Sequence, residues 1–431
     1  MEQDIFANYF EYVRETEPPI IFHRWSYLTS LGALIGQKAW IDQGHAGRVF
    51  PTLFVQLLGE PAARKSTSIK IIKRLITLAG YDTFAADKTT KEQFLQDLEG
   101  VAEDLETGSS KGKPRYDTVT ANNLWGREEN DREPREVFIM ADEFTDFAGA
   151  GNTEFFTTLG QFWDFDSPES SFTQRFKNTR SLNIYQPTVS ILSGNTPERF
   201  NLCFPPIALG GGFLTRLLLI YGERSGRKIT RPPLPPKEIG ASLVSFLQAV
   251  RSRTPGELDT TPAAYLLLDA IYKEETILPD IRFRGYINRR GTQLLKISVI
   301  LAVCKFHRAI EEDDILQANT ILTHAELLMP KAMGEFGKSK DSDVVNKVME
   351  ILNSTHKPLT GLQLWGLLNG PSLMSAQKNL ADLLNGLLAA NKIQLVNIPG
   401  VGSGFLPKKA IIPEPKYVDW NFLTEEERSS L

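Results

Sequence analysis

The chain of 431 residues carries 48 Lys and Arg against 52 Asp and Glu, a formal net charge of −4, and 42% of its residues are hydrophobic. This length is typical of two or three domains, the composition is that of a globular protein, and the charge excludes a surface covered uniformly by cations. No run approaches the ~20 apolar residues of a transmembrane helix, and the acidic start MEQDIFANYF is unlike a signal peptide, so we expect a cytoplasmic protein with no membrane partner.

Residues 1–45 are predicted to be mainly helical, with helices over 4–17 and 20–40 on either side of a Pro-Pro pair. Two strands are expected next, AWIDQG and RVFPTLFVQLLG, and the second leads directly into the stretch LLGEPAARKSTSIK. A helix over 66–80, a short strand DTFAA and a helix over 89–100 complete this part. Residues 106–135 are polar and charged, which indicates an inserted loop.

The stretch after RVFPTLFVQLLG approaches the phosphate-binding pattern G-x-x-x-x-G-K-[ST], with Arg64 in place of the second glycine. In such a loop, backbone N–H groups surround the phosphates, Lys65 neutralises their oxygens and Ser66 ligates Mg²⁺. Arg64 still supplies a backbone N–H, so we expect the loop to function if this position needs no positive φ. The alternative is a lysine-rich surface turn. The candidate ATP-binding residues here are Gly59, Glu60, Pro61, Ala62, Ala63, Arg64, Lys65, Ser66 and Thr67.

Two later strands end in polar residues of the kind that ATP hydrolysis needs. VFIMADE brings Asp142 and Glu143 to the end of an apolar strand, where Asp142 would hold Mg²⁺ and Glu143 would polarise water. TVSILSGN ends in Asn195, which would orient the attacking water, although GNTP is also good turn chemistry. Because strands alternate with helices, we expect a parallel sheet with these residues at its carboxyl edge.

Between these strands, SSFTQRFKNTRSLNIYQ predicts a β-hairpin that carries Arg175, Lys177 and Arg180. These cations, interleaved with aromatic residues, are candidates for binding single-stranded DNA, and a solvated hairpin face is the alternative. The stretch GGGFLTRLLLIYGE then gives another strand, and RPPLPPK is a stiff linker. Residues 239–337 are expected to be helical throughout. Cys203 and Cys304 are expected to be inert core thiols.

The region after GKSKDSD is predicted as three helices, a strand, a glycine turn and a strand, with Thr360 and Gln363 forming a capping box. This order is similar to a winged helix, which we expect either to dock a protein or to contact DNA weakly. The acidic, aromatic tail YVDWNFLTEEERSSL is expected either to bind another protein or to pack on its own domain.

The chain resembles AAA+ ATPases, in particular the helicase domains of phage and plasmid replication proteins. The resemblance lies in four motifs and their order along the chain: LLGEPAARKS, VFIMADE, SILSGN and GGFLTRLLLIY. FLTRLLLIY is also similar to a segment of minichromosome maintenance helicases, and this likeness implies that Arg216 is an arginine finger acting on a neighbouring subunit. The likeness of YINRRGTQLLKISVIL to an AAA+ lid implies Arg290 as a second sensor, with Arg289 and Lys296 as neighbouring choices.

The expected fold is α/β, an AAA+-type parallel-sheet core with N-terminal helices, a helical lid and a winged-helix-like domain. The expected parts are 1–45 (N-terminal helices), 46–230 (ATPase core), 238–338 (lid), 342–410 (winged helix) and 411–431 (tail). The resemblance implies an ATP- and Mg²⁺-dependent hexameric ring that moves on single-stranded DNA as a replicative helicase. The alternative is a loader or scaffold ATPase that assembles on a primase or polymerase without unwinding DNA.

Overall fold

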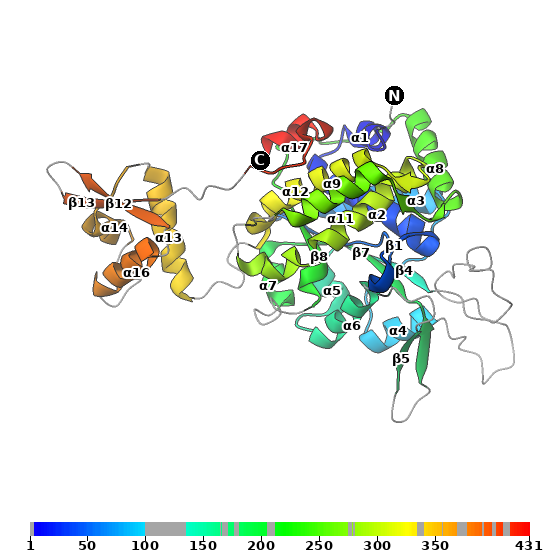
Figure 1. The fold of residues 1–431 in the computed structure, drawn as a ribbon, viewed down its shortest axis with the longest axis horizontal. Helices are drawn as coiled ribbons and strands as arrows, with labels where there is room; N and C mark the ends of the chain where they lie inside the picture. Colours follow the sequence, from blue (N-terminus) through cyan, green and yellow to red (C-terminus); the bar gives the residue numbers. More distant parts are fainter. Residues whose placement is uncertain are drawn as a thin grey trace. The chain divides into compact units, whose positions relative to one another are not determined.

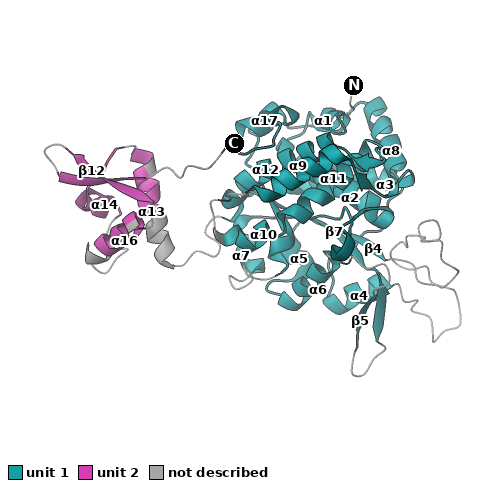
Figure 2. Ribbon diagram, viewed as in Figure 1, with its two compact units in different colours: residues 1–334, 415–431 teal, residues 335–414 magenta. Residues whose placement is uncertain are grey.

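The computed structural model forms two compact units, residues 1–334 with 415–431 and residues 335–414 (Figure 2). It describes residues 4–99, 135–163, 165, 171–175, 181–204, 212–274, 278, 281–333, 340–355, 357–368, 377–389, 392–398, 402–407 and 414–431. The predicted insertion at 106–135 lies outside these ranges except for Arg135. Among the described helices, none combines the length and the apolarity needed to cross a bilayer.

The first unit is built on a sheet of four parallel strands in the order β4-β7-β3-β8. The strands are β3 (Phe54–Leu58), β4 (Glu136–Ala141), β7 (Thr188–Asn195) and β8 (Leu217–Tyr221). Every residue in these strands except Tyr221 is buried, as expected for strands covered on both faces. The predicted α/β class with a parallel sheet is therefore confirmed.

Helices lie against both sides of this sheet (Figure 1). Strand β7 contacts three helices: α2 (Ile20–Ile35), α5 (Phe144–Ala148) and α6 (Thr153–Trp163). Of the sixteen residues of α2, all but Ile20 are buried, so this helix lies inside the unit. The remaining helices are α1 (Ala7–Val13), α3 (Lys65–Leu78), α4 (Lys91–Glu99), α7 (Pro197–Cys203), α8 (Lys237–Ser252), α9 (Pro262–Lys273), α10 (Arg284–Ile287), α11 (Arg290–Cys304) and α12 (Glu312–Met333).

The segment RVFPTLFVQLLG forms two strands, not the single strand that was predicted. Strand β2 (Arg48–Val49) pairs with β1 (Ala39–Asp42) in a small sheet, whereas β3 belongs to the central sheet. Pro51 lies between them and has no N–H to donate to a ladder, so the chain leaves one sheet before it enters the other. The predicted strand DTFAA makes only one isolated bridge, Phe84 to Phe138.

The prediction that residues 239–337 are helical throughout is wrong. Strands β9 (Gly256–Glu257), β10 (Asp259–Thr260) and β11 (Ala309–Ile310) lie within this range. Strand β9 adds to β1, and β10 pairs with β11. Between β9 and β10, the N–H of Leu258 donates to the carbonyl of Trp40, and its side chain is 1% exposed. Burial of Leu258 stabilises an extended segment here. The helical spacing of apolar residues in the sequence did not indicate it.

The predicted hairpin is present as β5 (Ser171–Gln174) paired antiparallel with β6 (Leu182–Tyr185). Its turn, including Lys177 and Arg180, lies outside the described residues. Short 3₁₀ turns complete the first unit: Gly36–Lys38, Gly44–Ala46, Leu214–Arg216, Ile281–Phe283 and Trp420–Phe422.

The C-terminal segment, residues 415–431, belongs to the first unit and contains helix α17 (Glu425–Ser429). Leu423 is 2% exposed and Glu427 is 1% exposed. The N–H of Asp419 donates to Thr320 of α12, and Asn319 donates to the carbonyl of Tyr417. Of the two alternatives for the tail, packing on its own domain is the one that the structure contains.

The second unit contains α13 (Lys340–Thr355), α14 (Gly361–Leu367), α16 (Gln377–Ala389), β12 (Ile393–Ile398) and β13 (Gly402–Pro407). The two strands form an antiparallel hairpin. The predicted capping box is confirmed: the Gln363 N–H donates to the Thr360 hydroxyl, and the Thr360 N–H donates to the Gln363 side chain. The core is a cluster of leucines with Val348 and Ile393.

Candidate nucleotide-binding site

Residues 59–66 connect the carboxyl end of β3 to the start of α3, so the helix directs its first N–H groups at the loop. Among the described residues, no backbone or side-chain group accepts a hydrogen bond from the N–H of Lys65 or Ser66. The Lys65 ammonium donates to the carbonyls of Gly59 (2.7 Å) and Glu60 (3.1 Å), so it folds back over the loop. Partial burial lowers the pKa of Lys65, and the nearby Glu143 and Glu198 oppose that effect.

The condition set for this loop, that position 64 needs no positive φ, is not met. Arg64 has φ 61° and ψ 28°, and Ala62 also has a positive φ of 69°. A left-handed conformation costs a residue with a Cβ roughly 1–2 kcal/mol, which explains why the motif has glycine at this point. The Arg64 guanidinium lies 2.5 Å from the carboxylate of Glu17, so it points toward the N-terminal helices. The backbone of the loop therefore turns at position 64 as it would with glycine, but Arg64 adopts a strained conformation there.

The two acids follow β4 at the same edge of the sheet, and each has a cationic partner. Asp142 pairs with Lys70 of α3 at 2.8 Å, and Glu143 pairs with Arg199 of α7. Side-chain exposures of 46% for Asp142 and 33% for Glu143 leave both carboxylates accessible. Neither Lys70 nor Arg199 was identified from the sequence. The one available signal was that each lies in the first two turns of a helix that follows a candidate site residue, α3 after the loop and α7 after Asn195.

Asn195 ends β7, the strand between β3 and β4, and is completely buried. Its Oδ1 accepts a hydrogen bond of 3.3 Å from Thr145, and its Nδ2 is buried with no hydrogen-bond partner in the described structure. At the neighbouring Gly194, an added Cβ would lie 2.8 Å from the Asp142 carbonyl and 3.4 Å from the Lys65 Cβ. The loop, the acids and Asn195 therefore converge on one place, as the sequence predicted.

Arg216 lies at the opposite edge of the sheet. It directly precedes β8, where Leu217 pairs with Phe54, whereas the loop follows Leu58, which pairs with Tyr221. Four residues of a strand span about 13 Å. The half-buried Arg216 donates to the carbonyl of Gly212 (2.6 Å), and its guanidinium carbon lies 5.7 Å from the Trp163 ring centroid. In this conformation Arg216 is not positioned to act on the loop of its own chain.

Arg290 does not fit the role of a second sensor. Its Nε lies 2.9 Å from Oε1 of Glu326, and its Nη2 donates to Asn319 and Thr323 of α12. The Tyr286 hydroxyl also donates to Glu326. These groups are buried, and burial raises the pKa of Glu326 although Arg290 and Tyr286 act against it. The network joins α11 to α12 and uses the donors that a sensor would direct at a nucleotide.

The two neighbouring candidates for a second sensor, Arg289 and Lys296, do not contact the described residues of the loop either. The Lys296 ammonium is buried and donates to the carbonyls of Phe50 and Trp163. The Arg289 guanidinium lies 6.0 Å from the Trp163 ring centroid. Lys296 thus contacts the segment before β3 and the end of α6, and Arg289 contacts the end of α6.

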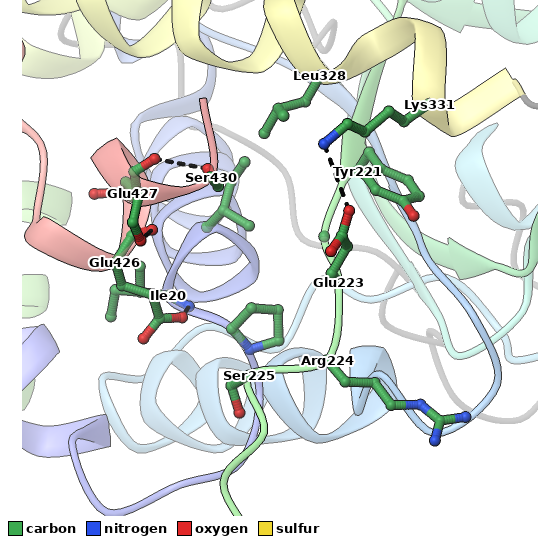
Figure 3. Close-up of a pocket in the computed structure, with 14 residues that line it drawn as sticks. Ile20, Tyr221, Glu223, Arg224, Ser225, Leu328, Lys331, Glu426, Glu427 and Ser430 are labelled. Atoms are coloured by element: carbon green, nitrogen blue, oxygen red, sulfur yellow. Dashed lines mark hydrogen bonds and ion pairs between the residues drawn. The ribbon is translucent and has the colours of Figure 1, made fainter. Parts of the chain in front are cut away.

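A cavity of about 320 Å³ lies at the end of β8, next to α2, α12 and the C-terminal segment (Figure 3). Its walls are residues 19–21 at the start of α2, residues 221–225 after β8, two residues of α12 and the end of the C-terminal segment. The N–H of Gly222 donates to the carbonyl of Leu58, and Arg224 donates to the carbonyl of Pro61 (2.6 Å). An added Cβ at Gly59 would lie 2.5 Å from the Gly222 carbonyl, so loop and cavity wall are in direct contact.

The hairpin brings one candidate DNA-binding residue into the described structure. Arg175 follows β5 and is exposed, while Lys177 and Arg180 fall outside the described ranges. Both cysteines are free and buried, and burial raises the pKa of the Cys203 thiol to about 12, as expected of an inert thiol.

Comparison with known proteins adds no family to these observations, since neither a protein-family model nor a curated protein matches the sequence. Within the described ranges, no three His, Cys, Asp or Glu side chains gather into a metal site of their own.

Proposed function

We propose that the loop, the two acids and Asn195 bind and hydrolyse Mg²⁺-ATP. The observation that supports this proposal best is that Lys65, Asp142 and Asn195 all lie next to Gly194, where the backbone of Asp142 and the side chain of Lys65 leave no room for a Cβ. The N–H groups of Lys65 and Ser66 and the Lys65 ammonium would receive the phosphates. Ser66 and Asp142 would hold Mg²⁺, which neutralises developing charge on the phosphates when it is bound.

In this proposal, Glu143 polarises the attacking water and Asn195 orients it. The unpartnered Nδ2 of Asn195 is a buried donor that would gain an acceptor from the water or from the γ-phosphate. Arg199 holds Glu143 away from that role until the pair opens. The cavity beside the loop would receive the base and ribose, because its volume lies within the ~300–1,000 Å³ of small-molecule sites.

We assign Arg216 to the site of a neighbouring copy of this chain. Its position at the amino end of β8 supports this assignment, because it is remote from its own loop. An arginine supplied in trans stabilises the charge of the phosphoryl-transfer transition state, commonly by ~1,000-fold or more in kcat. Such sharing requires a closed ring or a filament of identical subunits. The parallel sheet and the order of its polar strand ends are compatible with an AAA+ core.

The hairpin would bind single-stranded DNA inside the ring. Six copies of a hairpin with Arg175, Lys177 and Arg180 produce a positive lining although the whole chain is acidic. Hydrolysis would then move the hairpins and the strand, as in a replicative helicase of a phage or mobile element. The second unit, with its three described helices and a hairpin, is compatible with a winged helix.

The test uses two inactive variants that complement each other. Lys65→Ala and Arg216→Ala should each abolish turnover, with the second still binding ATP. In an equal mixture, about one interface in four pairs an intact Lys65 with an intact Arg216, so phosphate release should recover. Arg253→Ala, at an exposed arginine after α8, is the control. Full activity of Arg216→Ala alone, or no recovery in particles shown by mass to be mixed, would contradict a shared site.

The acidic balance of the chain favours one second candidate, a loader or scaffold ATPase that does not unwind DNA. Strand displacement on a forked duplex separates the two functions. Unwinding that depends on ATP supports the helicase, and DNA-stimulated hydrolysis without displacement supports the loader.

A further inference from the structure

The C-terminal segment supplies one wall of the cavity beside the phosphate loop. Glu426, Glu427, Ser429 and Ser430 line it from this side, opposite residues of β8 and α12 (Figure 3). More than 350 residues of sequence separate these residues from the loop. Residues distant in the sequence therefore form one wall of the cavity next to the candidate site.

The contacts of this segment are specific and buried. The Arg24 guanidinium pairs with Glu427, and both side chains are at most 1% exposed. Glu426 accepts a hydrogen bond of 2.7 Å from the Ile20 N–H, which is at the start of α2 and lines the same cavity. His324 of α12 lies 3.1 Å from both the Glu427 carbonyl and the Ser430 hydroxyl. The segment thus joins α2 to α12 across the cavity.

The polar groups of the cavity suit the nucleoside end of a nucleotide. Ribose hydroxyls and exocyclic amines are hydrogen-bond donors, and the carboxylates of Glu223 and Glu426 and the serine hydroxyls accept. Ile20, Tyr221 and Leu328 offer apolar surface for a base. The Lys331 ammonium lies 3.5 Å from the Glu223 carboxylate, so the negative charge of Glu223 already has a cationic partner in the cavity.

We propose that the C-terminal segment is part of the nucleotide site and holds the base and ribose, so that nucleotide binding and docking of this segment stabilise each other. This inference rests on the proposed ATP site. A ligand that binds only the docked form must be released before the segment can open. Docking therefore sets how long the nucleotide is retained.

Hydrogen exchange of the full-length protein with a non-hydrolysable ATP analogue and Mg²⁺ tests the coupling. At 100 times its Kd, the analogue should slow exchange of residues 418–431 by up to ~100-fold, along with the loop at 59–66. Slower exchange at the loop with no change in 418–431 would overturn this inference but leave the ATP site standing. No change at either place, with no binding, would overturn both.

A substitution that fills the cavity gives an independent test. Ser429 lines the cavity, and its hydroxyl donates only to Glu426 three residues earlier, so Ser429→Trp should leave the segment docked. It is expected to weaken binding of the analogue at least tenfold without changing the unfolding midpoint. The matched control is Ser252→Trp, at an exposed serine that donates to Ala249 in the same way at the end of α8. Unchanged affinity of Ser429→Trp would overturn the proposal.

Discussion

The guanidinium of Arg24 binds both carboxylate oxygens of Glu427, which lies 403 positions later, at 2.5 and 2.7 Å. The rings of Phe6, Phe10 and Phe422 surround this guanidinium at 4.6 to 5.3 Å. Burial alone would raise the pKa of Glu427, but the charge and hydrogen bonds of Arg24 outweigh it and keep the pKa below its usual value. The charged pair is therefore the main attachment of the C-terminal segment to α2.

Glu427→Gln should lower the free energy of unfolding by about 3–5 kcal/mol, because it leaves the buried Arg24 charge without a counter-ion. Glutamine preserves the capping box that Glu427 forms with Thr424, so the loss reports the charge and not the helix cap. Urea unfolding followed by circular dichroism measures the change. Glu425→Gln, on the exposed side of the same helix, is the control and should shift stability by less than ~0.5 kcal/mol. Equal stability of the two variants would contradict the assignment.

Arg64→Gly should leave ATP affinity unchanged or improve it. Glycine removes roughly 1–2 kcal/mol of left-handed strain, and the lost ion pair with Glu17 involves a guanidinium that is 54% exposed to solvent, which weakens its contribution. Arg64→Val should weaken binding, since a β-branched residue tolerates φ 61° poorly. Titration with a fluorescent ATP analogue compares the three proteins. A tenfold loss of affinity in a folded Arg64→Gly protein would show instead that the guanidinium contacts phosphate.

Lys65→Ala and Lys70→Ala should differ sharply although both remove a lysine from α3. Loss of Lys65 removes the cation over the loop and should reduce phosphate release by about 100-fold or more. Loss of the exposed Lys70 frees Asp142 from an ion pair worth at most about 1 kcal/mol, so the Mg²⁺ concentration needed for half-maximal turnover should fall or stay the same. Steady-state turnover against Mg²⁺ gives both quantities. Similar rates for the two variants would remove Lys65 from the mechanism.

Arg175→Ala should reduce DNA-stimulated turnover and leave the basal rate unchanged, because the hairpin leads into the amino end of β7, whereas the candidate catalytic residues follow the carboxyl ends of the strands. Each lost phosphate contact should also reduce the slope of log affinity against log salt by about 0.7 for a single strand. Lys177→Ala is expected to behave in the same way. Filter binding at several salt concentrations, beside ATPase assays, provides the readout, with Arg253→Ala as the control. A variant that keeps the full salt slope and full stimulation would exclude the hairpin as the DNA contact.

Acidification from pH 6.5 to 4.5 should destabilise the protein partly through His23. Burial, aided by the charge of Arg227, lowers the pKa of His23 to about 3, so it stays neutral in the folded chain. The unfolded chain binds the proton below about pH 6.5, so stability falls as pH falls, by up to ~1.4 kcal/mol per unit for this one group. His324, whose pKa is also lowered mainly by burial, adds to the slope.

Unfolding midpoints of His23→Gln across this range should show a shallower pH dependence than the wild type. Gln retains groups that can bond to Tyr9 and Thr16, which contact His23 in the native chain. His45→Gln, in an exposed 3₁₀ turn, should leave the slope unchanged. A slope in His23→Gln equal to that of the wild type would show that this histidine does not bind a proton on unfolding.

Local patterns in the sequence predicted much of the candidate site. Apolar runs identified the buried strands, and the polar residues after them gave Lys65, Asp142 and Asn195, since parallel strands bring their carboxyl ends to one edge. The capping box of Thr360 and Gln363 was likewise visible from spacing alone. These features depend on residues a few positions apart.

Features that depend on distant parts of the chain were not predictable. No spacing rule connects Arg24 to Glu427, Arg199 to Glu143 or Arg290 to Glu326, because tertiary packing creates each pair. The left-handed φ of Arg64 could not be read from the sequence for a similar reason, since its partner Glu17 lies in the segment between α1 and α2. The resemblance of the lid misplaced Arg290 because a helix pattern does not show which side of the helix becomes buried.

The chain leaves the first unit at Gly334 and re-enters it at Pro415, so the second unit is an insertion within the sequence of the first. Joining α12 to Pro415 by a short flexible linker should keep the first unit intact, whereas trimming the chain after residue 414 would remove a piece of that unit itself. A bulky group attached at Leu431 would lie next to the cavity wall that Ser429 and Ser430 form, and is expected to weaken docking of this segment.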